Sequence, residues 1–133
     1  MKKITEHWLN VAMDDLLAAK QLLSVEGLTN LVAYHAQQCI EKSMKALIEE
    51  ISVPNVKTHD LLRLYRLLQK EITISDTATL IDLNGLYTDS RYPGDAGLLP
   101  GGKPTADEAM LFVTFADSVF SQLRDHLAAK FPD

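Results

Sequence analysis

Residues 87–102, "YTDSRYPGDAGLLPGG", bring an arginine, a tyrosine and two aspartates together with glycines and prolines. The guanidinium of Arg91 could hold phosphate oxygens through paired hydrogen bonds, and the ring of Tyr92 could stack on a nucleobase. The same residues also have a structural interpretation, in which Pro93 ends a helix, Tyr92 packs against the protein and Arg91 pairs with Asp89. The segment is therefore compatible with a phosphate clamp and with a helix terminator.

Thr58, His59 and Asp60 form a second group of residues able to do chemistry. Thr58 can cap the free N–H groups at the start of a helix, which would put His59 and Asp60 in its first turn, or Asp60 can itself meet the first-turn N–H groups. The functional alternative places His59 and Asp60 beside a ligand phosphate, where an imidazole can exchange protons near neutral pH.

Gln38, Lys42 and Lys45 follow one another at steps of four and three residues, so on a helix they share one face, with Glu41 beside them. One interpretation is a solvated face on which Glu41 pairs with Lys45 for a small gain in stability. The alternative is that Lys42 and Lys45 line a groove that faces a phosphate, together with Arg91.

The sequence offers no pattern for a metal ion or a cofactor. None of its four histidines is spaced four residues from another with a carboxylate between them, and its single cysteine cannot form a multi-cysteine site. The glycines before Lys103 lack the strand and the Ser or Thr of a phosphate-binding Walker loop. We expect neither a metal nor a cofactor.

Composition limits the remaining possibilities. The 133 residues are 47% hydrophobic, which fits one domain, residues 1–133, with a single core. A formal charge of −5 leaves no basic field over the whole molecule, so a nucleic acid would have to be held by a local patch. Cys39 lies in an apolar periodic stretch, which favours a buried thiol and a reducing compartment. We find no signal peptide or membrane span, and we expect a cytoplasmic protein without membrane contact.

Hydrophobic periodicity predicts helices and no convincing strands. Apolar residues recur at helical steps over 4–25 and 32–51, and Pro54 separates the second stretch from a shorter helix that follows Thr58. Ser75 and Asp76 mark a fourth start, and that helix must stop before Pro93. Its predicted apolar face contains Ile81, Leu86 and Tyr87. Thr105 and Glu108 form a capping box before a long last helix. Short connections between these elements predict an all-α, antiparallel, up-and-down bundle of about five helices.

Four blocks carry a resemblance to a known family: "AMDDLLAAKQLL", "YHAQQCIEKSMKALI", "KTHDLLRL" and "LYTDSRYP". In order and spacing they resemble the HEPN domain family. The resemblance implies a helical bundle like a nucleotidyltransferase substrate-binding subunit, usually a homodimer, often encoded beside a minimal nucleotidyltransferase. It also implies nucleotide binding, and many members are RNA-cutting toxins of toxin–antitoxin or defence systems.

The RNA-cutting members share an arginine followed, after four to six residues, by a histidine, and this sequence departs from that motif. After Arg91 those positions hold Ala96, Gly97 and Leu98, and no other arginine has a histidine at this spacing. The chain is therefore expected to bind a nucleotide or RNA without the usual cleavage. Two alternatives stay open: a non-catalytic dimerisation module that docks on a nucleotidyltransferase, and a ribonuclease that pairs Arg91 with His59.

Overall fold

The computed structural model describes residues 1–54, 56–90 and 102–133, and for residues 87–90 it describes the backbone alone. This part of the chain contains five α-helices and no strand. They are α1 (Lys3–Leu22), α2 (Thr29–Ile51), α3 (Leu61–Leu68), α4 (Thr77–Ser90) and α5 (Ala106–Lys130). None of these helices is long and apolar enough to cross a membrane.

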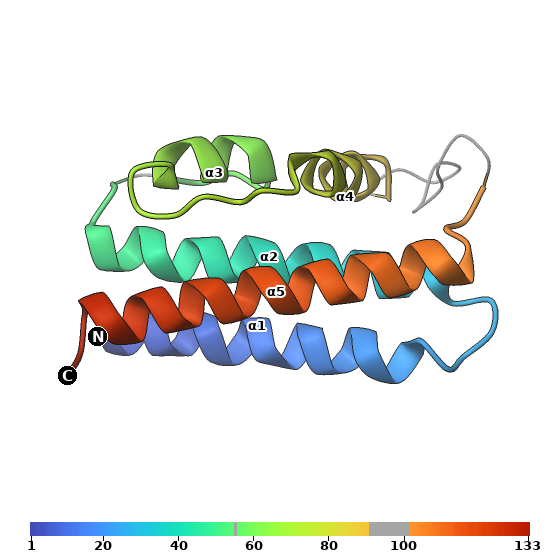
Figure 1. The fold of residues 1–133 in the computed structure, drawn as a ribbon, viewed down its shortest axis with the longest axis horizontal. Coiled ribbons are helices and arrows are strands. Elements are labelled where there is room, and N and C mark those ends of the chain that lie inside the picture. Colours follow the sequence, from blue (N-terminus) through green and yellow to red (C-terminus); the bar gives the residue numbers. More distant parts are fainter. Residues whose placement is uncertain (55, 91–101) are drawn as a thin grey trace.

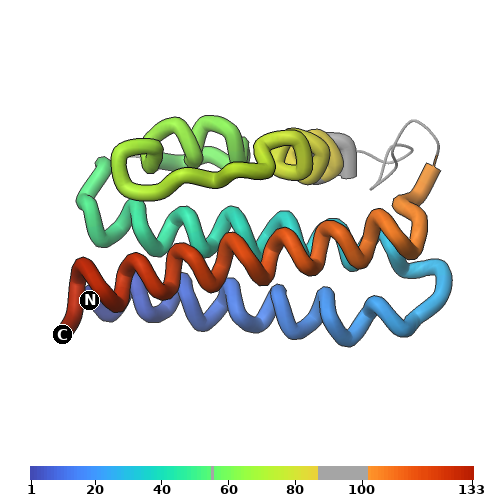
Figure 2. Tube along the Cα trace, in the orientation of Figure 1, coloured from blue at the N-terminus to red at the C-terminus, as the bar shows by residue number. Residues whose placement is uncertain are grey.

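The three long helices lie side by side, and the two shorter ones cover one side of them (Figure 1). The trace in Figure 2 shows α1 running in one direction and α2 and α5 in the other. α3 runs along α2, whereas α4 is seen nearly end-on and so crosses the long helices (Figure 1). The prediction of an all-α antiparallel bundle of about five helices is confirmed.

α2 is the central helix, because it packs against each of the other four. Its predicted apolar stripe is buried, but so are Gln38 and Glu41, which the sequence had suggested for an outer face, and the neighbouring Gln37. The interpretation of Glu41 as part of a solvated face was therefore wrong. Where neighbouring elements cover α2, its polar residues must find partners inside the bundle.

The helix boundaries follow local signals, with some corrections. Thr105 and Glu108 form the predicted capping box of α5, with both reciprocal hydrogen bonds present. α4 is described to Ser90, and the predicted stop at Pro93 lies outside the described residues. Of its predicted apolar face, Leu86 is buried and Ile81 is wrong, being 52% exposed, while the side chain of Tyr87 lies outside the described residues. Thr79, Leu80 and Leu83 are the other buried residues described on this helix.

The structure decides between the two caps predicted for α3, Thr58 and Asp60. The N-cap of this helix is Asp60, whose carboxylate accepts hydrogen bonds from the backbone N–H groups of Leu62 and Arg63. Thr58 instead accepts a hydrogen bond from the backbone N–H of Asp60. His59 and Asp60 therefore precede the first turn of α3. Asp60 is better placed than Thr58 to cap α3, because Asp60 lies two and three residues before Leu62 and Arg63, whose backbone N–H groups are free.

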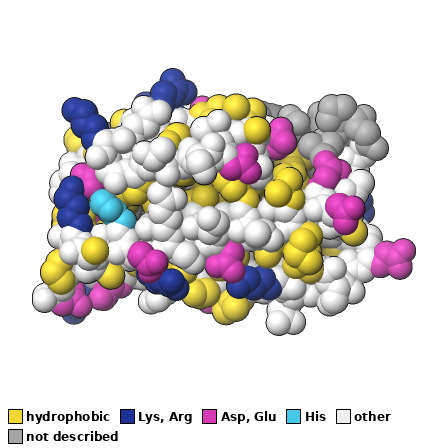
Figure 3. Space-filling view, in the orientation of Figure 1, with side chains coloured by type: hydrophobic (Ala, Val, Ile, Leu, Met, Phe, Trp, Pro, Cys, Tyr) yellow, Lys and Arg dark blue, Asp and Glu magenta, His cyan; other side chains and the backbone are white. Residues whose placement is uncertain are grey.

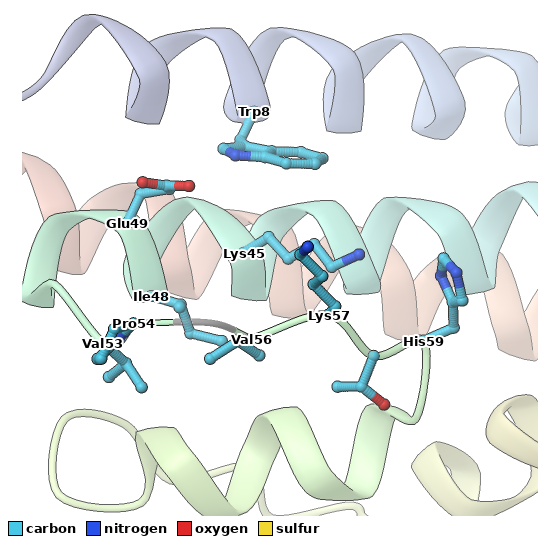
Figure 4. A pocket seen from close by; sticks show the side chains of 10 residues that line it. Trp8, Lys45, Ile48, Glu49, Val53, Pro54, Val56, Lys57 and His59 are labelled. Carbon is cyan, nitrogen blue, oxygen red and sulfur yellow. The ribbon is translucent and has the colours of Figure 1, made fainter.

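The chain turns back on α2 before it reaches α3. Ser52 follows α2 in the left-handed conformation, with φ of 59°, and its N–H donates to the carbonyl of Glu49. Residues 53, 54 and 56–59 then run along α2 without regular structure (Figure 4). This return brings His59 beside Glu41, which lies 18 residues earlier in the chain.

Candidate functional site

A groove of about 540 Å³ lies where α1, α2 and the segment after α2 meet. Trp8 extends from α1 over it, the side chains of α2 form one wall, and the segment from Val53 to His59 forms the other (Figure 4). The described residues that line it are Trp8, Lys45, Ile48, Glu49, Val53, Pro54, Val56, Lys57, Thr58 and His59.

Glu41 anchors one end of this groove from inside the bundle. Its side chain is only 4% exposed, and its carboxylate lies 2.9 Å from Lys45 Nζ and 3.1 Å from His59 Nδ1. Because a carboxylate accepts hydrogen bonds, Nδ1 of His59 carries a proton in this contact. Gln37 donates to the other carboxylate oxygen at 3.5 Å, and Gln38 donates to Gln37 at 2.8 Å. The buried charge is thus paired and hydrogen-bonded, as burial requires.

Lys45 and Trp8 make contact across the groove. The ammonium of Lys45 lies 5.6 Å from the centroid of the indole ring, within the range of a cation–π interaction. The indole Nε1 is buried and has no hydrogen-bond partner within the described residues. Trp8 packs against the main core from α1 and also covers the groove.

Lys57 and Glu49 are the two groove residues with uncommitted charges. Neither side chain makes a hydrogen bond or ion pair with another residue in the part of the chain that the structure describes. Lys57 is exposed and Glu49 is partly buried. Since Lys45 is already neutralised by Glu41, the positive charge available to an anion comes first from Lys57.

Lys42 lies in a separate cluster between α1 and α2. Its ammonium is 2.6 Å from Asp15 Oδ2, and His35 Nδ1 is 2.9 Å from the other oxygen of the same carboxylate. Lys42 is not among the residues that line the groove. The structure therefore brings Lys45 and His59 together at one site and places Lys42 at another.

Asp60 lies next to the groove without lining it. Besides capping α3, its carboxylate accepts a hydrogen bond from the side-chain amide of Asn84 at 3.0 Å. Asn84 also accepts a hydrogen bond from the backbone N–H of Leu61. Asp60 thus joins α3 to α4, and its described contacts are those of a capping residue.

Arg91 and Tyr92, the first candidates from the sequence, lie outside the described residues. The groove adds three residues that sequence reasoning did not select, namely Trp8, Glu49 and Lys57. A signal for Lys57 was present, because it belongs to the "KTHDLLRL" block beside His59. Trp8 and Glu49 had no such signal, since their role depends on the return of the chain along α2.

Metal-binding and thiol chemistry receive no support from the described part of the chain. It holds no group of three His, Cys, Asp or Glu side chains that could bind a metal ion. Cys39 is buried as predicted, and burial raises the pKa of its thiol from 9.0 to about 12. A thiol held in its protonated form is a poor nucleophile.

Comparisons with known proteins agree with the fold and with the sequence blocks. The family described as the HEPN domain matches residues 5–125 of this chain. Among solved structures, the chain is similar to the crystal structure of an archaeal HEPN homologue, with 25% sequence identity and a TM-score of 0.69. That match covers 96% of this chain and 99% of the archaeal protein. A comparison with curated proteins gives no match.

Proposed function

The chain belongs to the HEPN domain family, and we propose that it binds the phosphate of a nucleotide or of RNA at the groove beneath Trp8. The observation that carries this proposal is the meeting of Lys45, Lys57 and His59 at one groove with the only tryptophan of the chain. Cations hold phosphate oxygens, and an aromatic face accepts a base. A local site of this kind suits a protein whose net charge is −5.

The proposed site extends the residues predicted from the sequence. In the groove the contacts are Lys45, Lys57 and His59. Arg91 and Tyr92, from the part of the chain between α4 and α5, are proposed as additional contacts. Lys42 and Asp60 stay predictions of ligand contact, to be tested beside the others, because their described side chains already serve an ion pair and a helix cap.

We propose binding without the usual RNA cleavage of the family. No arginine of the chain is followed by a histidine at the spacing of the cleavage motif. His59 contacts Glu41 at the groove. Under the alternative, RNA cleavage persists because His59 and Arg91 act together as a non-standard pair.

For the biological setting, we propose a homodimer that forms one half of a two-gene toxin–antitoxin or defence system with a minimal nucleotidyltransferase. The competing function is a non-catalytic module that docks on such an enzyme. The observation that favours docking is an exposed apolar surface on α1 and α5. Met110, 54% exposed, lines a shallow groove with Lys20 and Leu23, and Leu17, 50% exposed, lies one turn before Lys20.

The test is equilibrium binding of ATP, GTP and a short labelled RNA to the pure protein, at low and physiological salt, with RNA integrity measured in the same samples. Lys57→Ala and Arg91→Ala should each weaken binding, by about 1.5–3 kcal/mol if a charge-assisted hydrogen bond is lost. Lys70→Ala is the matched control, because Lys70 is exposed and does not line the groove.

Each outcome separates the functions. Saturable binding that is lost in Lys57→Ala and kept in Lys70→Ala, with intact RNA, supports a binding protein without cleavage. RNA cleavage abolished by His59→Ala would support the ribonuclease alternative. Absence of both binding and cleavage would leave the docking module, for which Met110→Glu should prevent co-purification with the nucleotidyltransferase.

A further inference from the structure

The groove beneath Trp8 has two chemically different ends. Glu49 lies at one end and His59 at the other, with Lys45 and Lys57 between them (Figure 4). His59 contacts Glu41, and the eight helical steps from Glu41 to Glu49 span roughly 12 Å at 1.5 Å per step. The groove is therefore about as long as one nucleotide, with an acidic end and a basic end.

The space between the ends suits a flat ring. Ile48, Val53, Pro54 and Val56 supply apolar side chains along the walls, and the indole of Trp8 lies over the opening (Figure 4). A base that enters here would be enclosed between an aromatic face and aliphatic groups, as bases commonly are in protein sites.

We propose that this groove binds a guanine nucleotide, with the base turned to Glu49 and the phosphate turned to Lys57 and His59. The inference rests on the proposed function and deepens it by naming the base. The ligand is a guanylate, whether it is free or a residue of single-stranded RNA.

The choice of base follows from the carboxylate of Glu49, which accepts hydrogen bonds and donates none at neutral pH. Guanine presents two neighbouring donors, its ring N1–H and its N2 amino group, which match the two oxygens of a carboxylate. Adenine and cytosine each place an acceptor nitrogen beside their amino group, and uracil places a carbonyl on each side of its N–H. Those acceptors would face the carboxylate and repel it.

Glu49 is available for this contact, because its side chain has no hydrogen bond or ion pair to another residue within the described ranges. A partly buried carboxylate without a partner is costly, and a ligand that donates two hydrogen bonds would supply what is missing. Lys57 likewise has no partner within the described ranges, and its ammonium can donate hydrogen bonds to a phosphate that lies toward His59.

The experiment uses Trp8 as an internal reporter, since it is the only tryptophan. The full chain is titrated with GMP, AMP, CMP, UMP and ribose 5-phosphate, and Trp8 fluorescence is recorded. Equilibrium dialysis with labelled nucleotides measures the same affinities independently of fluorescence. Two short single-stranded RNAs, one all uridine and one with a single guanosine, separate free guanylate from guanylate in RNA.

We expect GMP to bind about tenfold more tightly than the other nucleotides, the size of preference that a good bidentate contact gives. Glu49→Gln should abolish most of this preference, whereas Lys57→Ala should weaken all four nucleotides alike. Glu26→Gln is the charge-matched control, since Glu26 is exposed between α1 and α2 and does not line the groove.

Equal affinities for the four nucleotides, with loss in Lys57→Ala, would overturn the guanine inference and leave the proposed function intact. A preference unchanged in Glu49→Gln, or lost equally in Glu26→Gln, would also overturn it. No binding of any nucleotide or RNA would overturn the inference together with the proposed function. Tighter binding of the guanosine-containing RNA than of GMP would identify RNA as the source of the ligand.

Discussion

Glu41 shows how one buried charge can serve both stability and a binding site. It is nearly inaccessible, yet it holds Lys45 and His59 in place at the edge of the groove. Removing only one member of a buried pair leaves the other charge without compensation, and that costs more than replacing both members by apolar groups.

We therefore predict that Glu41→Gln lowers the free energy of unfolding by about 1.5–3 kcal/mol, the usual value of hydrogen bonds to charged groups. Adding Lys45→Met should recover part of this loss, because the half-buried ammonium is then no longer left without its partner. Urea denaturation of the two single variants and the double variant measures the coupling energy. If the two losses simply added, Glu41 and Lys45 would not act as a pair.

The start of α3 is determined by two helices together. Asp60 caps α3 from the segment before it, and Asn84 of α4 bonds both to the Asp60 carboxylate and to the backbone N–H of Leu61. Pattern reasoning found the helix but left Thr58 and Asp60 open as its cap, because both residues are good caps and only the backbone decides between them. The capping box at Thr105 was predictable, since Thr105 and Glu108 specify it by spacing alone.

For this cap we predict that Asp60→Ala lowers the free energy of unfolding by about 0.5–2 kcal/mol, whereas Asp60→Asn, which keeps a capping oxygen, loses less. Urea denaturation gives both values, and nucleotide titrations on the same samples test the ligand role. If Asp60→Asn folds normally but no longer binds nucleotide, Asp60 contacts the ligand as the sequence suggested. Retained binding would assign it to the cap alone.

The connection between α3 and α4 is attached to the end of α5 through Glu71. Its carboxylate lies 2.7 Å from Lys130 Nζ and 2.9 Å from His126 Nε2. Hydrogen bonds from Lys130 and then from His126 hold the pKa of Glu71 below its ordinary value of 4.5. At a pH just below 4.5 the unfolded chain therefore binds a proton at this residue that the folded chain does not.

This linkage sets the direction of a pH effect. The contribution of Glu71 to stability is fully present above the unfolded pKa and is lost as the pH falls through the lower folded pKa. We predict that the wild type is more stable than Glu71→Gln at neutral pH and that the difference shrinks below pH 4.5. Thermal unfolding of both proteins over a pH series measures it. A difference that stayed constant down to strongly acid pH would contradict the assignment.

Over the whole molecule, periodicity predicted the helices but not the environment of the central one. Gln37, Gln38 and Glu41 look like an outer face when α2 is considered alone, but they are buried in a bundle where α2 packs against each of the other four helices. The groove was not predictable from helical periodicity either, because it depends on contacts between separate segments. Trp8, Glu49 and Lys57 come from three separate segments, and only the return of the chain along α2 brings them together.

Charge is distributed in a way that limits how the whole molecule can bind nucleic acid. On the face shown in Figure 3, Asp and Glu side chains lie beside Lys and Arg side chains, without a continuous basic surface. With a net charge of −5, attraction to RNA must come from the few cations at the groove. Among the described residues these are Lys57, together with Lys45 and protonated His59 where a phosphate competes with Glu41 for them, so we count two or three contacts.

Because few cations contact the RNA, the binding constant for RNA should depend only weakly on salt concentration. For single strands the slope of log K against log salt is about −0.7 per phosphate neutralised, so two or three contacts give roughly −1.4 to −2.1. We predict a slope in this range for a short RNA, measured by binding titrations at four or more salt concentrations, and a shallower slope for Lys57→Ala. Since one contact accounts for about −0.7, a slope steeper than about −4 would require six or more phosphates. Such a surface could not be built from the groove alone and would place the RNA across a wider part of the bundle.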